Sequence, residues 1–161
     1  MLYERVVEVD ERVRADGTIE REPDLEAARA ALESARADGI KAVAVGVHAR
    51  LPLSEHERRV AALAREMGFA QVSVSHEVSP LIKLVGRGDT TVVDAYLSPI
   101  LRRYVAQVDR DLDAKQSAAR LMFMMSSGGL TAADLFQGKD AILSGPQAAL
   151  SAWPRPVGKP D

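Results

Sequence analysis

The chain contains no cysteine among its 161 residues. This absence excludes a disulfide framework, a thiolate metal site and a cysteine nucleophile, and it fits a protein of the reducing cytoplasm. Aromatic residues are scarce at 4%, so the core is expected to be aliphatic. The sequence also lacks a basic excess, with a formal net charge of -2, and it lacks a long apolar run. Nucleic-acid binding and membrane insertion are therefore not expected, because both need features that are missing here.

The residues that are present describe an ordinary folded protein. Hydrophobic residues make up 47% of the chain and charged residues 27%, which is typical of a globular domain. The length suits one core, so residues 1–150 are predicted to form a single α/β domain. Residues 151–161 contain three prolines and a glycine, which predicts an irregular C-terminal tail.

The first third of the sequence alternates predicted strands with a predicted helix. Residues 3–13 alternate valine with charged residues, which predicts a half-buried strand at a sheet edge or in an antiparallel pair. Apolar residues recur at three- and four-residue steps over 25–35, and Asp24 and Gly39 are placed to cap the two ends of that helix. The apolar run 40–47 predicts a strand that is covered on both faces.

A second helix and strand complete a repeating order. Residues Ser54 to Glu57 predict a capping box, in which the Ser54 hydroxyl accepts from the Glu57 amide and the carboxylate reaches back. The apolar face of this helix extends to Met67, and Val72 and Val74 mark another strand. The order strand, helix, strand, helix, strand predicts parallel crossovers, and hence a mixed, mainly parallel sheet with flanking helices.

The second half begins with a long amphipathic helix over residues 93–112. Pro99 either kinks this helix or starts its second half with Ser98 as the cap. Residues 121–125 are predicted to form a buried strand, and residues 131–134 to begin a short helix.

The most promising binding site in the sequence is a glycine turn between that strand and that helix. It consists of Ser126, Ser127, Gly128 and Gly129. Backbone amides at a helix N-terminus favour an anion, and glycine lets a ligand approach the backbone closely. The alternative is a turn that only reverses the chain, since neither phosphate-loop pattern matches. Ser144 and Gly145 form a second serine-led helix start, which is either a ligand contact or a simple cap.

The remaining polar groups are weaker candidates. His48, His56 and His76 invite a metal, but no pair has the spacing of a helical zinc site and no metal site is predicted. Residues 87–91 are either a polar active-site loop or the cap of the long helix. No serine, histidine and acid set follows from order or spacing.

Several segments, taken together and in order, resemble the hydantoinase A/5-oxoprolinase family, which also includes related subunits of acetone-type carboxylases. The segments are Leu2 to Val13, His56 to Val60, Glu77 to Ile82, Thr90 to Pro99, Ser126 to Leu130 and Leu143 to Pro146. They span residues 2 to about 150, so the resemblance covers most of the chain.

The resemblance implies part of an actin-like, ribonuclease-H-like fold that couples ATP hydrolysis to opening or carboxylating a small substrate. The family holds phosphates and magnesium with two hairpins of the type Asp-x-Gly-Gly-Thr-x-Thr-Asp, and neither occurs in this sequence. The chain is therefore expected to be an internal fragment of an ATP-dependent cyclic-amide hydrolase. ATP and magnesium are implied for the intact family, and no cofactor is expected for this chain alone.

Two other functions stay open. The chain could be a non-catalytic interaction or regulatory module, whose partner would be a hydantoinase B-type subunit or a second copy. It could also bind a small molecule through residues 127–129. A substrate is expected only in an intact assembly. The family has asparagine where this chain has Ser127 and Asp94, so its catalytic residues are not assigned here.

Overall fold

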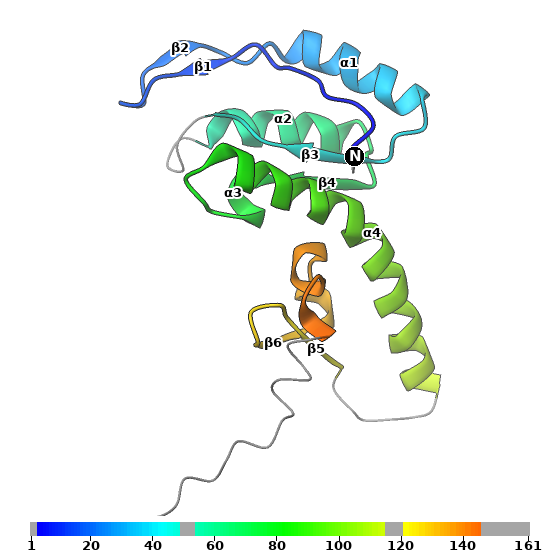
Figure 1. The fold of residues 1–161 in the computed structure, drawn as a ribbon. Coiled ribbons are helices and arrows are strands. Elements are labelled where there is room, and N and C mark those ends of the chain that lie inside the picture. The colour runs from blue at the N-terminus through cyan, green and yellow to red at the C-terminus, as the bar shows by residue number, and fades with distance from the viewer. Residues whose placement is uncertain (1–2, 49–53, 115–120, 146–161) are drawn as a thin grey trace, which may run out of the picture.

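The computed structural model describes residues 3–48, 54–114 and 121–145. The predicted tail at 151–161 lies outside the described residues. Figure 1 shows two α/β layers at the N-terminal end, a long helix leading away from them, and a small hairpin unit beside that helix.

A short hairpin opens the chain. Strands β1 (Arg12–Val13) and β2 (Ile19–Arg21) pair antiparallel around a turn in which Gly17 has φ 92° and the Thr18 amide donates to Asp16. The predicted strand over residues 3–13 is wrong in length, since only its last two residues pair. Residues 3–9 have no paired neighbour within the described part of the chain, and alternation alone does not make a strand.

Helix α1 (Leu25–Ala37) has the caps that the sequence predicts. The Asp24 carboxylate accepts from the Ala27 amide at 2.9 Å, and Gly39 takes φ 87° just beyond the C-terminal end. A side chain is strained at this φ, which is why glycine suits the position.

One of the two predicted parallel crossovers is confirmed. The first, from residues 3–13 to the strand at 40–47, does not form in the described chain, whose strands make three separate two-stranded sheets instead of one mixed sheet. Strand β3 (Ala42–Val45) pairs in parallel with β4 (Gln71–Val74), with Val43 opposite Val72, and α2 (Glu55–Glu66) connects them. Val45 is buried while Ala44 is exposed, although α4 as well as α2 packs against the strand pair. The prediction of a strand covered on both faces therefore holds for only part of β3.

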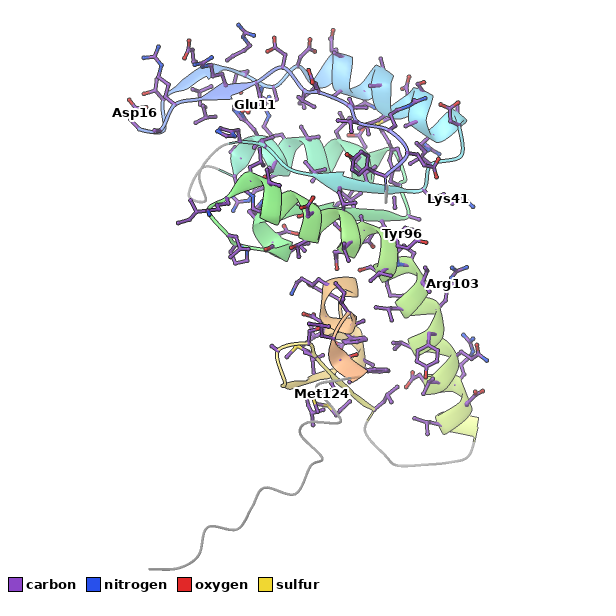
Figure 2. The ribbon with its side chains drawn as sticks, viewed as in Figure 1. Glu11, Asp16, Lys41, Tyr96, Arg103 and Met124 are labelled. Atoms are coloured by element: carbon purple, nitrogen blue, oxygen red, sulfur yellow. The ribbon has the colours of Figure 1, made fainter. Side chains whose placement is uncertain are left out.

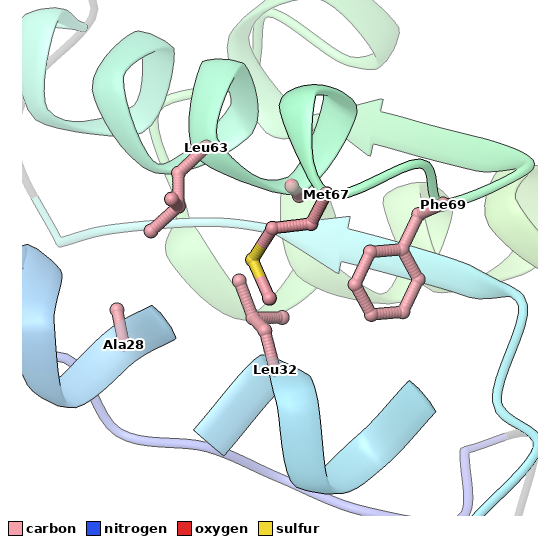
Figure 3. Close-up of a cluster of buried hydrophobic side chains, with 6 residues drawn as sticks. Ala28, Leu32, Leu63, Met67 and Phe69 are labelled. Atoms are coloured by element: carbon pink, nitrogen blue, oxygen red, sulfur yellow. The ribbon is translucent and has the colours of Figure 1, made fainter. Parts of the chain in front are cut away.

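The main core lies between α1 and α2, on the covered face of the strand pair (Figure 3). Its buried residues are Ala28, Leu32, Leu63, Ala64, Met67 and Phe69. A second cluster of Val45, Val60, Ala61 and Val74 joins the strands to α2. Burying side chains of this size contributes about 1.5–3 kcal/mol for each large residue, so this contact is the main attachment between the layers.

Two helices follow β4. Helix α3 (Ser75–Val78) is a single turn, and α4 (Leu84–Ala114) begins well before the predicted residue 93 and contains Pro99. Figure 1 shows α4 bending in its middle, as expected where proline lacks the amide of a helical hydrogen bond. Ser98 lies inside the helix, so of the two alternatives for Pro99 the kink holds and the cap at Ser98 does not. Within the described ranges, no helix is both long and apolar enough to cross a bilayer.

The C-terminal unit is a hairpin with two short 3₁₀ turns. Strands β5 (Met122–Met124) and β6 (Leu130–Ala132) pair antiparallel, followed by η1 (Ala133–Leu135) and η2 (Gly138–Ala141). The predicted buried strand is only half-buried, because the two-stranded unit has little to cover it. The helix predicted to begin at 131–134 is replaced by β6 and one 3₁₀ turn.

Candidate functional site

The predicted glycine turn is the loop of the β5–β6 hairpin and does not precede a helix. Gly128 takes φ 89°, and the Met125 amide donates to the Gly129 carbonyl at 2.8 Å. The amides of Ser126 and Gly128 donate to the carbonyls of Asp140 and Met125. The turn leads into β6, so the prediction that a helix begins directly after it is wrong, and the amides of Ser126 and Gly128 are used internally.

The serine hydroxyls beside this turn are also used internally. Ser126 donates to the Asp140 carbonyl at 2.7 Å and accepts from the Leu143 amide at 3.0 Å. Ser144 donates to the Ala141 carbonyl at 2.9 Å and is itself helical, as is Gly145. The structure thus brings Ser126 close to the Ser144 segment, with the hydroxyls holding the hairpin on η2.

A different polar cluster lies where β3 and β4 end, and Glu57 is its centre. This carboxylate comes from the first turn of α2 and is buried. Its Oε1 accepts from the Val47 amide at 2.9 Å and the Ser75 hydroxyl at 2.5 Å. Its Oε2 accepts from the His76 amide at 3.2 Å and lies 2.6 Å from His76 Nδ1. The predicted capping box is therefore wrong, because Glu57 satisfies the strand ends and the Ser54 hydroxyl makes no cap bond.

Arg87 provides the positive charge of this cluster. It lies in the first turns of α4 and is 2% exposed, so residues 87–91 are neither a loop nor a cap. Its guanidinium donates to the Ser75 hydroxyl at 2.8 Å, the Leu81 carbonyl at 3.0 Å and the Val47 carbonyl at 2.7 Å. Nη2 also lies 3.9 Å from Glu57 Oε1. The ion pair fixes the ends of both strands against α4.

The environment keeps Glu57 ionised. Burial raises the pKa of this carboxyl, but the hydrogen bonds from Ser75, Val47 and His76 outweigh burial and hold the pKa below its ordinary value. A buried charge is tolerated when it is paired and fully hydrogen-bonded, and both conditions are met here.

His76 is the member of the cluster that reaches the surface. Its side chain is 12% exposed, with Nδ1 against Glu57 and Nε2 3.8 Å from the exposed Glu77. A carboxylate on one imidazole nitrogen orients the ring and leaves the other nitrogen for proton transfer or hydrogen bonding. Sequence reasoning missed this group; the signal was the run of polar residues that directly follows β4.

A second buried carboxylate, Asp94, joins β4, α4 and η2. Oδ2 accepts from the Ser73 hydroxyl at 2.6 Å, and Oδ1 accepts from the Ser98 hydroxyl at 3.1 Å and the Lys139 amide at 3.2 Å. The Ser98 hydroxyl also accepts from the Gly138 amide at 3.0 Å. This network is what positions η2, and through it the glycine hairpin, on the middle of α4.

The three histidines do not form a metal centre. His56 is buried with Nδ1 2.6 Å from Glu11, and its Nε2 lies 3.6 Å from Glu22, so it ties the β1–β2 hairpin to α2. His48 is exposed. Within residues 3–48, 54–114 and 121–145, no three His, Asp or Glu side chains are arranged to hold a metal ion.

A parallel strand pair joined by a helix, with buried polar groups at the carboxyl ends of the strands, defines the α/β class in which that edge carries the functional groups. Residues 1–68 match the N-terminal region of the Hydantoinase/oxoprolinase family, and residues 87–155 match the Hydantoinase/oxoprolinase domain itself. The chain belongs to this family, as the motif series in its sequence predicts.

Known relatives agree with this assignment. The 5-oxoprolinase of Saccharomyces cerevisiae is 35% identical over 94% of this chain. The crystal structure of ATP-dependent caprolactamase from Pseudomonas jessenii superposes with a TM-score of 0.81 at 31% identity, covering 88% of this chain. Nucleotide-free acetone carboxylase superposes with a TM-score of 0.76 at 21% identity over 88% of this chain, which shows a shared fold.

These relatives are much longer than this chain. The matched region is 14% of the yeast 5-oxoprolinase and 21% of each of the two solved chains. The similarity therefore concerns one segment of a larger protein.

Proposed function

We propose that this chain supplies one α/β segment of an ATP-dependent cyclic-amide hydrolase of the hydantoinase/5-oxoprolinase type, within an actin-like nucleotide-binding fold. The observation that carries the proposal is the match of nearly the whole chain to a 5-oxoprolinase, together with a TM-score of 0.81 to an ATP-dependent caprolactamase. The chain alone does not turn over substrate in this proposal, because it corresponds to a small part of each relative.

The two buried carboxylates and the glycine turn leave few free groups for ATP and magnesium. A triphosphate needs several free backbone amides, and magnesium needs carboxylate or phosphate oxygens with free coordination positions. Glu57 and Asp94 already accept hydrogen bonds on both oxygens, and the glycine turn uses the amides of Ser126 and Gly128 internally. We therefore place the nucleotide-binding groups in the segments that the longer relatives have in addition.

The role that remains for this segment is to hold elements in place. The Glu57 and Arg87 cluster locks the carboxyl ends of β3 and β4 to the start of α4. The Asp94 network locks the middle of α4 to η2. In an assembled enzyme such a segment keeps the strand ends rigid. Within the Glu57 and Arg87 cluster, His76 is the side chain that reaches the surface.

The positive test is a chimera in which this chain replaces the aligned segment of the yeast 5-oxoprolinase. We expect ATP-dependent hydrolysis of 5-oxoproline, measured as ADP and glutamate, from the chimera and none from this chain alone. A matched chimera with Glu57→Gln controls for the buried cluster. A folded, soluble chimera without activity, or robust turnover by the chain alone, would contradict the proposal.

A second candidate is a non-catalytic interaction module. It is favoured by a stripe on α4 in which Tyr96, Ile100 and Tyr104 are exposed at four-residue steps. Exposed apolar stripes on helices mark interfaces, and one relative carries the name caprolactamase subunit alpha. Light scattering after size exclusion distinguishes the candidates: a stable complex with a hydantoinase B-type subunit, or a dimer, supports the module.

A further inference from the structure

A large cavity lies beside β3 and reaches Val47, whose amide and carbonyl belong to the Glu57 and Arg87 cluster. Its volume is about 1150 Å³, and it opens between the N-terminal segment 3–9 and the segment 39–48 that contains β3. Apolar side chains of two helices close it: Ala28, Leu32 and Ala35 from α1, and Leu84, Val92 and Ala95 from α4. Figure 2 labels Glu11 toward the hairpin end of this region and Lys41 and Tyr96 toward the opposite end.

The residues that line the cavity follow one another in the chain. All of residues 3–9 and all of residues 39–48 are among them. A strand that presents one face to a cavity contributes every second residue, because side chains alternate between faces. Consecutive residues mean that the backbone edges of both segments border the cavity.

Both edges have backbone groups to offer. Within the described part of the chain, β3 forms backbone ladder bonds with β4 alone, and residues 3–9 form no backbone hydrogen bond. The two segments also run in the same direction. Arg5 contacts Ser34 and Asp38 near the end of α1, and Glu11 contacts His56 at the start of α2, which is also where the chain after β3 meets Glu57.

We propose that this cavity is a slot for one additional β-strand, apolar on both faces, that pairs with β3 on one side and with residues 3–9 on the other. The donor is the remainder of a hydantoinase A-type polypeptide, since the relatives have several times the length of this chain. A sheet of two strands has fewer strands than an ordinary sheet, which has about four to six. Strand addition at an open edge is a common mode of protein association.

The size and lining of the slot fit this occupant. A strand of five residues is about 17 Å long. It occupies about 4.8 Å of the width of a sheet and about 10 Å of depth including its side chains, so its volume is roughly 800 Å³. The cavity exceeds this volume. Helix α1 would cover one face of the inserted strand and α4 the other, so both faces must be apolar. Exposed Val6, Val7 and Ala44 would become buried.

The probes are overlapping peptides of about 15 residues, long enough for one strand, taken from the yeast 5-oxoprolinase outside its aligned segment. Binding to the intact chain is measured by fluorescence anisotropy, and the site by hydrogen exchange of backbone amides. We expect a peptide with an apolar strand to bind and to slow exchange in both segments, 3–9 and 42–47. No binding by any peptide, or protection confined to other residues, would overturn the slot.

Two charged variants locate the binding. Ala44→Asp places a carboxylate in the slot, and we expect affinity to fall by about tenfold or more, because the charge would be buried without a partner. Ala30→Asp is the matched control on the exposed face of α1. Equal affinities for the two variants, with helix content intact by circular dichroism, would refute strand insertion. The result is independent of ATP chemistry, so an inactive chimera leaves it standing.

Discussion

Replacing Glu57 by glutamine keeps the size of the side chain and removes its charge. In the native protein, one oxygen faces the Val47 amide and the other faces the His76 amide. A glutamine has one oxygen and one NH₂ group, so each orientation points a donor at a backbone donor. The substitution also leaves the buried guanidinium of Arg87 without its nearest carboxylate.

The expected loss in the free energy of unfolding is large for a substitution that keeps the size of the side chain. A buried backbone amide that loses its acceptor costs about 1–3 kcal/mol, and breaking a buried ion pair costs about 3–5 kcal/mol. Because Arg87 keeps its bonds to Ser75 and to the carbonyls of Leu81 and Val47, we expect a loss of about 3 kcal/mol in the free energy of unfolding.

Urea unfolding followed by circular dichroism at pH 7 measures this loss. With a slope of about 2 kcal/mol per M, the midpoint should fall by about 1.5 M. The control is Glu55→Gln, two residues away in the same helix, which removes an exposed carboxylate that pairs with Arg58 and should change stability by less than about 0.5 kcal/mol. A midpoint for Glu57→Gln equal to that of the control would refute the account of the cluster.

The pH dependence gives an independent check on the same residue. The pKa of Glu57 is lower in the folded chain than its ordinary value, so its contribution is fully present above about pH 5. The contribution is lost as pH falls from there through the folded-state pKa. The stability difference between the native chain and Glu57→Gln should therefore shrink below about pH 4. A difference that stays constant from pH 7 to pH 3 would contradict an ionised Glu57.

Three further substitutions separate the networks. Asp94→Asn should cost about 1–3 kcal/mol, because its amide would face the buried Ser73 hydroxyl, which already accepts from Gln71 and would lose its own acceptor; urea midpoints equal to native would disprove this. Gly138→Ala should cost about 1–3 kcal/mol, because its Cβ would lie 2.7 Å from the Ser98 nitrogen, and a stability equal to native would disprove that close packing. Gly88→Ala, with open space around the Cβ inside α4, should stabilise by about 0.5–1 kcal/mol in the same assay, and a loss would contradict a helix there.

The elements with complete local signals were predictable from the sequence. Helix α1 has an apolar stripe and is flanked by its predicted capping residues, Asp24 and Gly39, and the structure confirms it. The apolar runs on either side of α2 likewise predict the parallel pair. In these cases the periodicity of side chains and the cap chemistry determine the local structure directly.

The candidate site was not predictable, because its contacts span distant positions. Ser54 and Glu57 have the spacing of a capping box, yet the carboxylate bonds groups that lie 10, 18 and 19 residues away. The local pattern favours Ser54 as the partner of Glu57, but the tertiary structure supplies partners that bond the carboxylate instead. No spacing rule connects Glu57 to Arg87, which lies on a different helix.

The predictions for the start of α4 and for the glycine turn were wrong for related reasons. Gly86, Gly88 and Thr90 are poor helix formers, so residues 84–92 do not look helical, but Arg87 and Thr91 are buried and hold that turn in place. A Ser-Ser-Gly-Gly turn suits a hairpin as well as a strand-to-helix loop. The bond from the Met125 amide to the Gly129 carbonyl selects the hairpin, and the sequence does not encode that choice locally.

Isothermal titration of the purified chain with ATP and magnesium tests most directly whether this segment lacks a nucleotide site of its own. We expect no saturable heat, because the carboxylates of Glu57 and Asp94 and the amides of Ser126 and Gly128 are already bonded within the protein. One-to-one binding with a dissociation constant below about 1 mM, or about 4 kcal/mol of binding free energy, would contradict it.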